Sequence, residues 1–524
     1  MSEQNGGARA GARLDLDERA AGLLLHPTSL PGPFESGDLG PSAHAMVDFL
    51  AAAGLRIWQM LPLGTVGPGN SPYSSSSVFA GSPWLVSLEH LATDGLLDAD
   101  DPALAPCTPS ATCDFGRSIE RRRGALARAF ERAKSRADVQ AATKSFREKH
   151  AYWLRDFALF STLKDVHGGA SHRAWPTALR MRDPSALAEA SREHADAIAL
   201  HEFIQFRFAS DVERLRSKAA SAGIALMGDA PIYVAEDSVE VWAHPELFLR
   251  DASGELASVA GVPPDAFSDE GQLWGNPLYD WDFMSRTGFG FWVARLEHAL
   301  RSFDAIRLDH FIGFSRYYAV ARGEKSAKRG TYHPVPGAQL FETLRRTLGR
   351  VPIVAEDLGV VTDEVRALRD QFAFPGMGVL EFSFSPDPGA ESSRPHRFPK
   401  RSVVYTGTHD NDTAAGWLAS PPDDASTDAR ARWAAERDFA IEYLGESPST
   451  PPSDLAWALV REAFRSHASI AIVPLQDLLG QGREARMNRP GVADGNWAYR
   501  ALPGQASAAL AARVARLGTL YGRR

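Results

Sequence analysis

Eight short apolar runs recur along the chain, and most are separated by segments that have the apolar spacing of amphipathic helices. A continuous apolar run of this kind is typical of a strand that is buried on both faces of a parallel sheet. Strands that alternate with helices build such a sheet, and eight units favour closure into a barrel. The sequence therefore predicts an α/β fold, a (β/α)8 TIM barrel, with strands at 21–26, 56–63, 224–229, 305–309, 351–356, 378–384, 402–408 and 470–474.

Two parts of the chain do not follow the barrel pattern. Residues 91–201 are rich in Ala, Arg and Glu, have helical periodicity and contain no strand of the barrel type. Residues 415–468 contain a second helical stretch. We therefore expect a single catalytic barrel domain over 21–524 that carries two inserted, mainly helical subdomains, preceded by a disordered tail over 1–20.

The composition narrows the class of protein. The 524 residues carry a net charge of -8, which argues against a general nucleic-acid or lipid-surface binder. No run of 18 apolar residues is present, so no membrane span is expected. The Gly- and Ala-rich start shows no apolar leader, and Cys107 and Cys113 fit no zinc pattern, so we expect two free thiols in a cytoplasmic protein.

Carboxylates follow three of the predicted strands. Asp309 and Glu356 end their strands, and Asp410 comes just after the strand at 402–408. The carboxyl ends of the strands form the catalytic face of a TIM barrel, so we expect these side chains to gather there. Glycoside cleavage needs one carboxylate as nucleophile or base and one carboxylic acid as proton donor, and a retaining enzyme holds the two about 5 Å apart. Neighbouring strands lie about 4.8 Å apart, so carboxyls on adjacent strand ends can meet that separation.

The sequence neighbours of two of these carboxylates point to different roles. Arg307 lies two residues before Asp309, on the same face of the strand, so we expect it to hold Asp309 ionised and to lower the pKa of that carboxyl. The adjacent acids Glu356 and Asp357 are expected to raise each other's pKa, and partial burial to raise it further, which suits a general acid. Two structural alternatives stay open, a plain ion pair between Arg307 and Asp309, and helix capping by Asp357 with Glu356 as a bystander.

Asp410 stands between His409 and Asn411 in a polar cluster that is suited to hydrogen bonds with sugar hydroxyls. A third carboxylate at this place can stabilise an oxocarbenium-like transition state. A metal site formed by His409, His310, Asp309 and Asp410 is the rival interpretation, although the spacing of these residues matches no known ligand motif.

Short motifs that match one family run along most of the chain, from about residue 22 to about residue 500. They are HPTSLPG at 26–32 with GDLG at 37–40, WQMLPLG at 58–64, SPYSS at 71–75 with FAG at 79–81, GDAPIYV at 228–234, VPPD at 262–265 leading to GQLWGNP at 271–277, PLQDLL at 474–479, and NRPG at 488–491 with NW at 496–497. In these motifs the chain resembles the 4-α-glucanotransferases, also called amylomaltases or disproportionating enzymes (glycoside hydrolase family 77), which are relatives of the α-amylase clan.

The resemblance implies a TIM barrel and a retaining double displacement that needs no organic cofactor and no metal. An α-1,4-glucan donor is cleaved, the glucan is held on the enzyme, and it passes to the 4-hydroxyl of a glucose or maltooligosaccharide acceptor. The matching motifs imply that Asp309 is the nucleophile, Glu356 the acid/base and Asp410 the transition-state stabiliser. They imply substrate binding by Tyr73, Asp229, Trp274, Arg307, His310, His409 and Asn488.

The chain departs from the family pattern outside the three carboxylates. Ile312 stands where an Arg is usual, and the segment 319–323, which includes Arg322, differs from the usual Pro-Ala-Gly run. Ala266 stands where an aromatic residue is often found, and Tyr499 where a Trp is common. We expect these departures to affect acceptor binding and the exclusion of water rather than the cleavage step.

Alternatives to glucan transfer stay open. A retaining α-glucan hydrolase would use the same carboxylates, because transfer prevails only if a sugar acceptor is positioned and water is excluded. Residues 263–274 form the candidate loop for excluding water. A non-catalytic glucan-binding protein would have no use for a carboxylic acid of raised pKa, and a metal-dependent hydrolase would be sensitive to a chelator.

Overall fold

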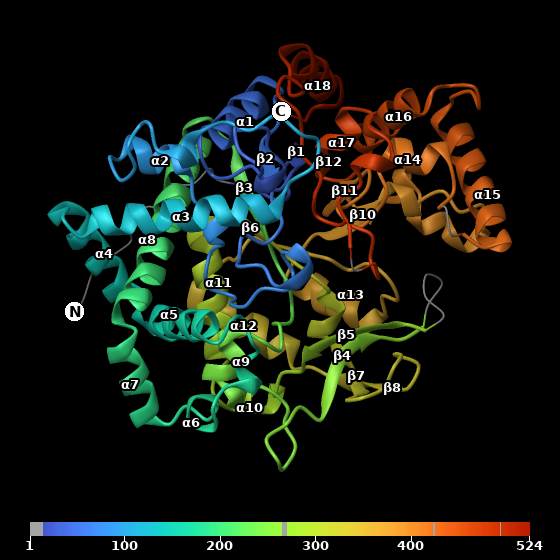
Figure 1. Cartoon of the computed structure of the whole chain (residues 1–524). Coiled ribbons are helices and arrows are strands. Elements are labelled where there is room, and N and C mark those ends of the chain that lie inside the picture. The colour runs from blue at the N-terminus through green and yellow to red at the C-terminus, as the bar shows by residue number, and fades with distance from the viewer. Residues whose placement is uncertain (1–13, 265–269, 423–424, 493, 524) are drawn as a thin grey trace, which may run out of the picture.

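The centre of the computed structural model, which describes residues 14–264, 270–422, 425–492 and 494–523, is a parallel sheet of eight strands (Figure 1). The strands follow the order β10-β11-β12-β1-β2-β3-β6-β9. The two ends of this order meet where the amide of Ala355 in β9 donates to the carbonyl of Pro375, just before β10, at 2.9 Å. The sheet is therefore a nearly closed barrel, and the predicted fold class is confirmed. Its strands are β1 (Ala20–Leu24), β2 (Ile57–Gln59), β3 (Ala225–Ala230), β6 (Ala305–Leu308), β9 (Ile353–Ala355), β10 (Gly376–Val379), β11 (Ser402–Tyr405) and β12 (Ile470–Pro474).

All eight predicted barrel strands are present, but several are shorter than predicted. The largest difference is at β10, which ends at Val379 and continues as a short 3-10 helix over Leu380–Phe382. Leu380 and Phe384 are buried although they lie outside the strand. The apolar run therefore continues past the strand end, and apolar character alone does not locate that end.

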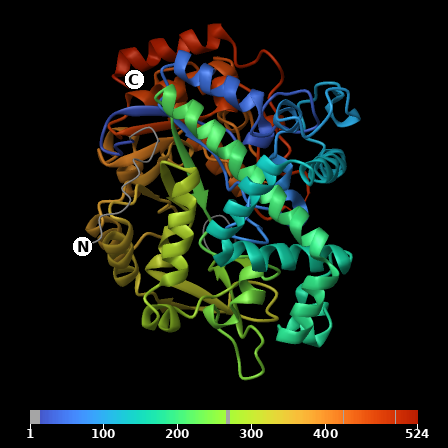
Figure 2. The same cartoon turned by 90° about the vertical axis from the view of Figure 1, so that its left-hand side faces the viewer.

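Helices cover the outside of the barrel and build the subdomains (Figures 1 and 2). Between β10 and β11 the described chain has only short 3-10 segments, whereas the other consecutive barrel strands are connected through at least one α-helix. The helices are α1 (Pro41–Ala52), α2 (Leu88–Thr93), α3 (Phe115–Ala133), α4 (Ala137–Lys149), α5 (Ala151–Val166), α6 (Thr177–Arg180), α7 (Pro184–Glu193), α8 (Ala195–Ser221), α9 (Val239–Ala243), α10 (Trp281–Arg286), α11 (Gly290–Ser302), α12 (Gly337–Leu348), α13 (Asp363–Gln371), α14 (Ala414–Ala419), α15 (Thr427–Leu444), α16 (Pro452–Arg465), α17 (Leu475–Leu478) and α18 (Ala508–Tyr521). No helix in the described part of the chain is both long and apolar enough to cross a membrane.

The helical insertions lie on opposite sides of the barrel in Figure 1. Helices α3 to α7 build the first insertion, and the long α8 connects it to the barrel, where it packs against α1 and β3. In the second helical stretch, α16 packs against β12, α17 and α18. Helix α16 therefore belongs to the outer layer of the barrel, and α14 and α15 form the projecting part.

A second sheet was not predicted from the sequence. Strands β4 (Ser258–Val262), β5 (Gln272–Pro277), β7 (Arg316–Ala321) and β8 (Gly330–Pro334) form an antiparallel sheet in the order β5-β4-β7-β8, which lies below the barrel in Figure 1. This sheet lies outside both predicted helical insertions, in the segments between β3 and β6 and between β6 and β9. Strand β8 is mostly exposed and β5 is only partly buried, so neither has the continuous apolar run that identified the barrel strands.

The last residues of the expected disordered tail over 1–20 are packed against the rest of the chain. Residues 1–13 lie outside the described part, but Leu16 is buried and β1 starts at Ala20. The Arg19 guanidinium donates to the carbonyls of Phe464 and Tyr521, each at 3.1 Å. Residues 14–20 are therefore packed against the C-terminal part of the chain.

A buried ion pair attaches the first insertion to the loop that follows β1. The Arg122 side chain of α3 is fully buried and donates to the Asp38 carboxylate at 2.8 Å and to the Ser118 hydroxyl at 2.7 Å. We expect Arg122→Ala to lower the free energy of unfolding by about 3–5 kcal/mol, because it leaves the Asp38 carboxylate buried without its countercharge. Urea unfolding followed by circular dichroism measures this loss.

The matched control is Arg117→Ala in the same helix, whose side chain is 78% exposed and lies 3.8 Å from Asp114. An exposed pair of this kind contributes at most about 1 kcal/mol. Equal losses for the Arg122 and Arg117 variants would show that the buried pair does not hold the insertion in place.

Candidate active site

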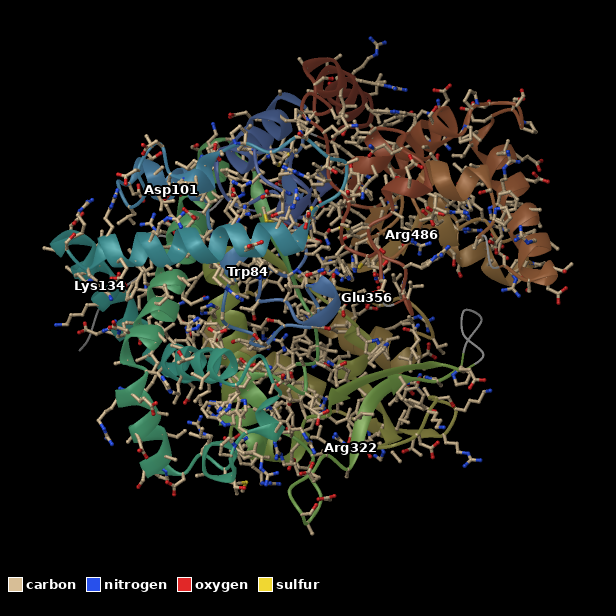
Figure 3. The ribbon with its side chains drawn as sticks, in the orientation of Figure 1. Trp84, Asp101, Lys134, Arg322, Glu356 and Arg486 are labelled. Atoms are coloured by element: carbon tan, nitrogen blue, oxygen red, sulfur yellow. The ribbon has the colours of Figure 1, made fainter. Side chains whose placement is uncertain are left out.

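The register of β6 and β9 brings two of the predicted carboxylates to neighbouring strand ends. Leu308 lies opposite Ala355 in this parallel pair, so Asp309 and Glu356 leave the barrel side by side. The amide of Glu356 donates to the carbonyl of Leu308 at 3.0 Å, which continues the pairing beyond the strands. Figure 3 shows Glu356 in the middle of the molecule, between the barrel and the second sheet. Because adjacent strands lie about 4.8 Å apart, both carboxyl groups start from adjacent backbone positions.

Arg307 holds a buried hydrogen-bond network beneath these carboxylates. Its Nη2 donates to Asp229 Oδ2 at 2.6 Å and to Asp309 Oδ1 at 2.9 Å. The Tyr73 hydroxyl donates to the same Asp229 oxygen at 2.6 Å. Asp229 lies opposite Arg307 in the pairing of β3 with β6, and the Asp229 side chain is fully inaccessible. Arg307 therefore shares its charge between Asp309 and Asp229, and its ion pair with Asp309 is not exclusive.

The expected lowering of the Asp309 pKa is wrong. Burial raises the pKa of Asp309 to about 7, and the negative charges of Asp229 and Asp410 act in the same direction. The Arg307 charge lowers this pKa only in part, because the guanidinium is shared with Asp229. The sequence shows the arginine two residues away but not the second carboxylate that competes for it.

The expected raising of the Glu356 pKa is confirmed, with burial as its first cause, but the neighbouring charge that raises it is that of Asp309 and not that of Asp357. Burial, followed by the neighbouring charge of Asp309, raises the pKa of Glu356 to about 8. Asp357 faces away, accepting from Arg369 Nη1 at 2.5 Å and from the Met377 amide at 2.8 Å. The capping alternative is also wrong, because the next helix, α13, starts only at Asp363.

A left-handed turn directs the chain away from the barrel directly after Asp309. His310 has a φ of 50°, and its amide donates to Glu356 Oε2 at 2.6 Å. The second Glu356 oxygen accepts from the Leu358 amide at 3.1 Å. The His310 ring meets the Trp274 ring edge to face, with centroids 4.8 Å apart. Glu356 is therefore oriented by the backbone, and Trp274 comes to the site from β5.

The third predicted carboxylate, Asp410, lies on the loop after β11. Its Oδ1 accepts from Asn488 Nδ2 at 2.6 Å, and His409 Nε2 lies 3.4 Å from Oδ2. The His409 ring stacks on the Tyr73 ring at 5.0 Å. Asp410 is the most open of the three carboxylates, with 47% of its side chain exposed. Through these contacts the structure brings together all ten residues that the sequence predicted for the site.

Two residues of this site were not predicted. Trp497 lies with its ring centroid 5.8 Å from Tyr73 and 5.9 Å from His409. Arg486 donates through Nη2 to the Asp410 carbonyl at 2.6 Å. Arg486 lies two residues before Asn488, and Trp497 is part of the NW motif at 496–497. The family motifs in this segment could therefore have identified both residues.

The described residues give no support to the rival interpretation of a metal site. Within the described ranges, no three or more His, Cys, Asp or Glu side chains are grouped so that they could hold a metal ion. The His310 and His409 rings instead pack against Trp274 and Tyr73.

Three of the residues that depart from the family pattern are held by packing, an ion pair or a hydrogen bond within the protein. Ile312 is buried in the 3-10 turn that follows His310. Arg322 forms an ion pair with Glu236 at 2.9 Å and lies in the lower part of Figure 3. The Tyr499 hydroxyl donates to Gln481 at 2.7 Å. Ala266 lies in 265–269, the part of the candidate water-excluding loop that falls outside the described residues.

A TIM barrel with carboxyl groups on two adjacent strand ends and a third on the loop after β11 defines a class, the enzymes that act on glycosidic bonds. The comparisons with known proteins identify the family. The family model described as 4-alpha-glucanotransferase matches residues 25–504. The 4-alpha-glucanotransferase of Thermus thermophilus is 47% identical over 503 residues, which cover 95% of this chain and 97% of that protein. The corresponding protein of Synechocystis is 43% identical over 515 residues, with 97% and 99% covered.

A solved structure agrees with this result. Amylomaltase from Streptococcus agalactiae in complex with acarbose matches with a TM-score of 0.90 and 33% identity, covering 97% of this chain and 100% of that one. The chain belongs to the 4-α-glucanotransferase family and is an enzyme of glucan transfer.

The raised pKa of Glu356 predicts a pH-dependent stability effect. The folded protein holds a proton at Glu356 up to a pH of about 8, whereas the ordinary value is 4.5. Between these values the folded state binds more protons than the unfolded state, so this group's contribution to stability falls as the pH rises. We expect Glu356→Gln to raise Tm relative to the natural protein, by an amount that is small at pH 5 and grows up to pH 8.

Differential scanning calorimetry across this pH range measures the two Tm values. Glu148→Gln, at a side chain that is 69% exposed on α4, serves as the control and should give a Tm difference that is nearly constant with pH. A Tm difference for Glu356→Gln that does not change with pH would contradict the proton assigned to Glu356.

Proposed function

We propose that this enzyme transfers α-1,4-glucan segments by a retaining double displacement, with Asp309 as the nucleophile and Glu356 as the acid/base. The observation that carries the proposal is the register of β6 and β9, which sets these carboxyl groups on adjacent strand ends. A retaining mechanism requires a separation of about 5 Å, which is the spacing of neighbouring strands. An inverting enzyme needs a wider gap, because a water molecule must fit between the sugar and its base.

In the first displacement an Asp309 carboxylate oxygen forms a bond to the anomeric carbon of the donor. The bond from that carbon to the glycosidic oxygen breaks, and the oxygen takes the proton of Glu356. The hydrogen bond from Arg307 at 2.9 Å leaves the second oxygen of Asp309 to attack. The raised pKa of Glu356 keeps its proton available near neutral pH.

In the second displacement the ionised Glu356 takes the proton of the acceptor's 4-hydroxyl. That oxygen attacks the anomeric carbon, and Asp309 leaves as a carboxylate. The two backbone amides that bind Glu356 are donors and favour its ionised form, so they support this return step. The acceptor is glucose or a maltooligosaccharide, and water in its place would give hydrolysis.

Asp410 is proposed to stabilise the positive charge that develops on the sugar ring, since it is the most open of the three carboxyl groups, with 47% of its side chain exposed. Tyr73, Asp229, Trp274, Arg307, His310, His409 and Asn488 are proposed to bind the sugar or to hold the groups that do. The stacked rings of Tyr73 and His409 support this, because the apolar face of a pyranose packs on aromatic rings.

We place the reaction in the cytoplasm as part of the same proposal. Cys107 and Cys113 are both free and partly exposed, which is compatible with a reducing compartment.

The proposal predicts the effect of removing each carboxylate. Asp309→Asn and Glu356→Gln should each lower turnover of maltotriose by at least about a thousandfold, because each removes a group that makes or breaks a bond. Thin-layer or anion-exchange chromatography follows free glucose and longer maltooligosaccharides together. The natural protein should give a ladder of longer products with little gain in reducing ends.

Asp363→Asn is the matched control, since its carboxylate is 97% exposed at the start of α13, and its turnover should be unchanged. A rate near that of the natural protein in either the Asp309 or the Glu356 variant would show that the roles are misassigned. Glucose and maltose alone, with rising reducing ends, would make the enzyme a hydrolase.

A further inference from the structure

The loop that carries Asp410 has an unusual support. Behind it lies a cavity of about 30 Å³ whose lining includes Thr408, His409, Asn411 and Asp412 of the loop. A cavity of this size can hold one or two water molecules, and close packing does not hold the loop there. Hydrogen bonds therefore help to hold the Asp410 backbone on this side, in addition to the packing of the His409 ring on Tyr73.

Arg486 supplies two of these hydrogen bonds. Its Nη2 donates to the Asp410 carbonyl at 2.6 Å, and its Nε donates to the Asn488 carbonyl at 2.7 Å. Asn488 in turn donates through its amide to the His409 carbonyl at 3.0 Å and through Nδ2 to the Asp410 carboxylate at 2.6 Å. The guanidinium thus bridges the backbones of the two segments that orient the Asp410 side chain.

We propose that Arg486 is a positioning residue for Asp410, which fixes the distance between the loop after β11 and the segment around Asn488. Figure 3 labels Arg486 on the C-terminal part of the chain, above and to the right of Glu356. The proposal rests on the role of Asp410 under the proposed function. It adds a residue that contacts the loop backbone and does not need to touch the sugar.

The surroundings of Arg486 explain why a guanidinium serves here. Two bonds to two different carbonyls require donors in a fixed fork, which a lysine ammonium on its flexible stem does not provide. The carboxyl groups of Asp412 and Glu381 lie close enough to interact with the Arg486 charge, and the Glu381 side chain is buried. Asp412 is itself in an ion pair with Arg483, whereas the Arg486 guanidinium donates to the two backbone carbonyls.

The test is a double-mutant cycle on the purified full-length enzyme with maltotriose as substrate. We expect Arg486→Gln to lower kcat about ten- to a hundredfold, the size of one lost charged hydrogen bond, with KM changed less than about threefold. We expect the double variant Asp410→Asn/Arg486→Gln to be no slower than Asp410→Asn alone, because Arg486 acts through Asp410. A merely structural role would lower the amount of folded enzyme without this dependence on Asp410.

Arg19→Gln is the matched control, because Arg19 also donates to backbone carbonyls but at the amino end of the barrel. It should keep the kcat of the natural protein per folded molecule. If Arg486→Gln does not fold, Arg486→Lys replaces it in the same cycle and should still lower kcat at least about threefold, because the fork is lost.

The outcomes separate the two proposals. An Asp410→Asn variant that keeps the natural rate would overturn the role of Asp410 itself. A slow Asp410→Asn variant combined with a natural rate for the Arg486 variant would overturn the role of Arg486 alone. Losses that multiply in the double variant would likewise show that Arg486 does not act through Asp410.

Discussion

One buried cation organises the centre of this enzyme. The Arg307 side chain is only 4% exposed, and its Nη2 contacts carboxylates from two strands, Asp229 of β3 and Asp309 at the end of β6. A buried carboxylate is costly without a partner, so both acids depend on this guanidinium. Tyr73 adds a hydroxyl donor to Asp229. The orientation of the proposed nucleophile therefore follows from the pairing of β3 with β6 rather than from a flexible side chain.

The same cation sets the charge balance of the cleft. Asp229 and Asp309 already share one positive charge, and burial keeps the nearby histidines neutral by lowering the pKa of His310 to about 4 and that of His409 below its ordinary value. Burial and the neighbouring Asp309 charge keep the proton on Glu356, although the Arg307 charge acts on its pKa in the opposite direction. The direct hydrogen bond from Arg307 to Asp309 favours the ionised form of that carboxylate and so distinguishes the nucleophile from the proton donor.

Much of this arrangement could be predicted from the sequence, because barrel strands have continuous apolar runs and the carboxylates follow those runs directly. The network around Arg307 could not be predicted, since it depends on Asp229 lying opposite Arg307 in the register of two strands far apart in sequence. The direction in which Asp357 points also depends on tertiary packing, here on Arg369 and β10. The antiparallel sheet that brings Trp274 to the site was missed because β5 is partly exposed and β8 mostly exposed, so neither has a continuous apolar run.

The central claim, that Asp309 forms a covalent bond to the sugar, is tested most directly by trapping that intermediate. In Glu356→Gln, an α-maltosyl fluoride donor needs no proton to release fluoride, whereas the return step lacks its base, so the intermediate should accumulate. Mass spectrometry of the digested protein should then find one maltosyl group on the peptide that contains Asp309. A maltosyl group on another residue, or fluoride release without any adduct, would contradict the account.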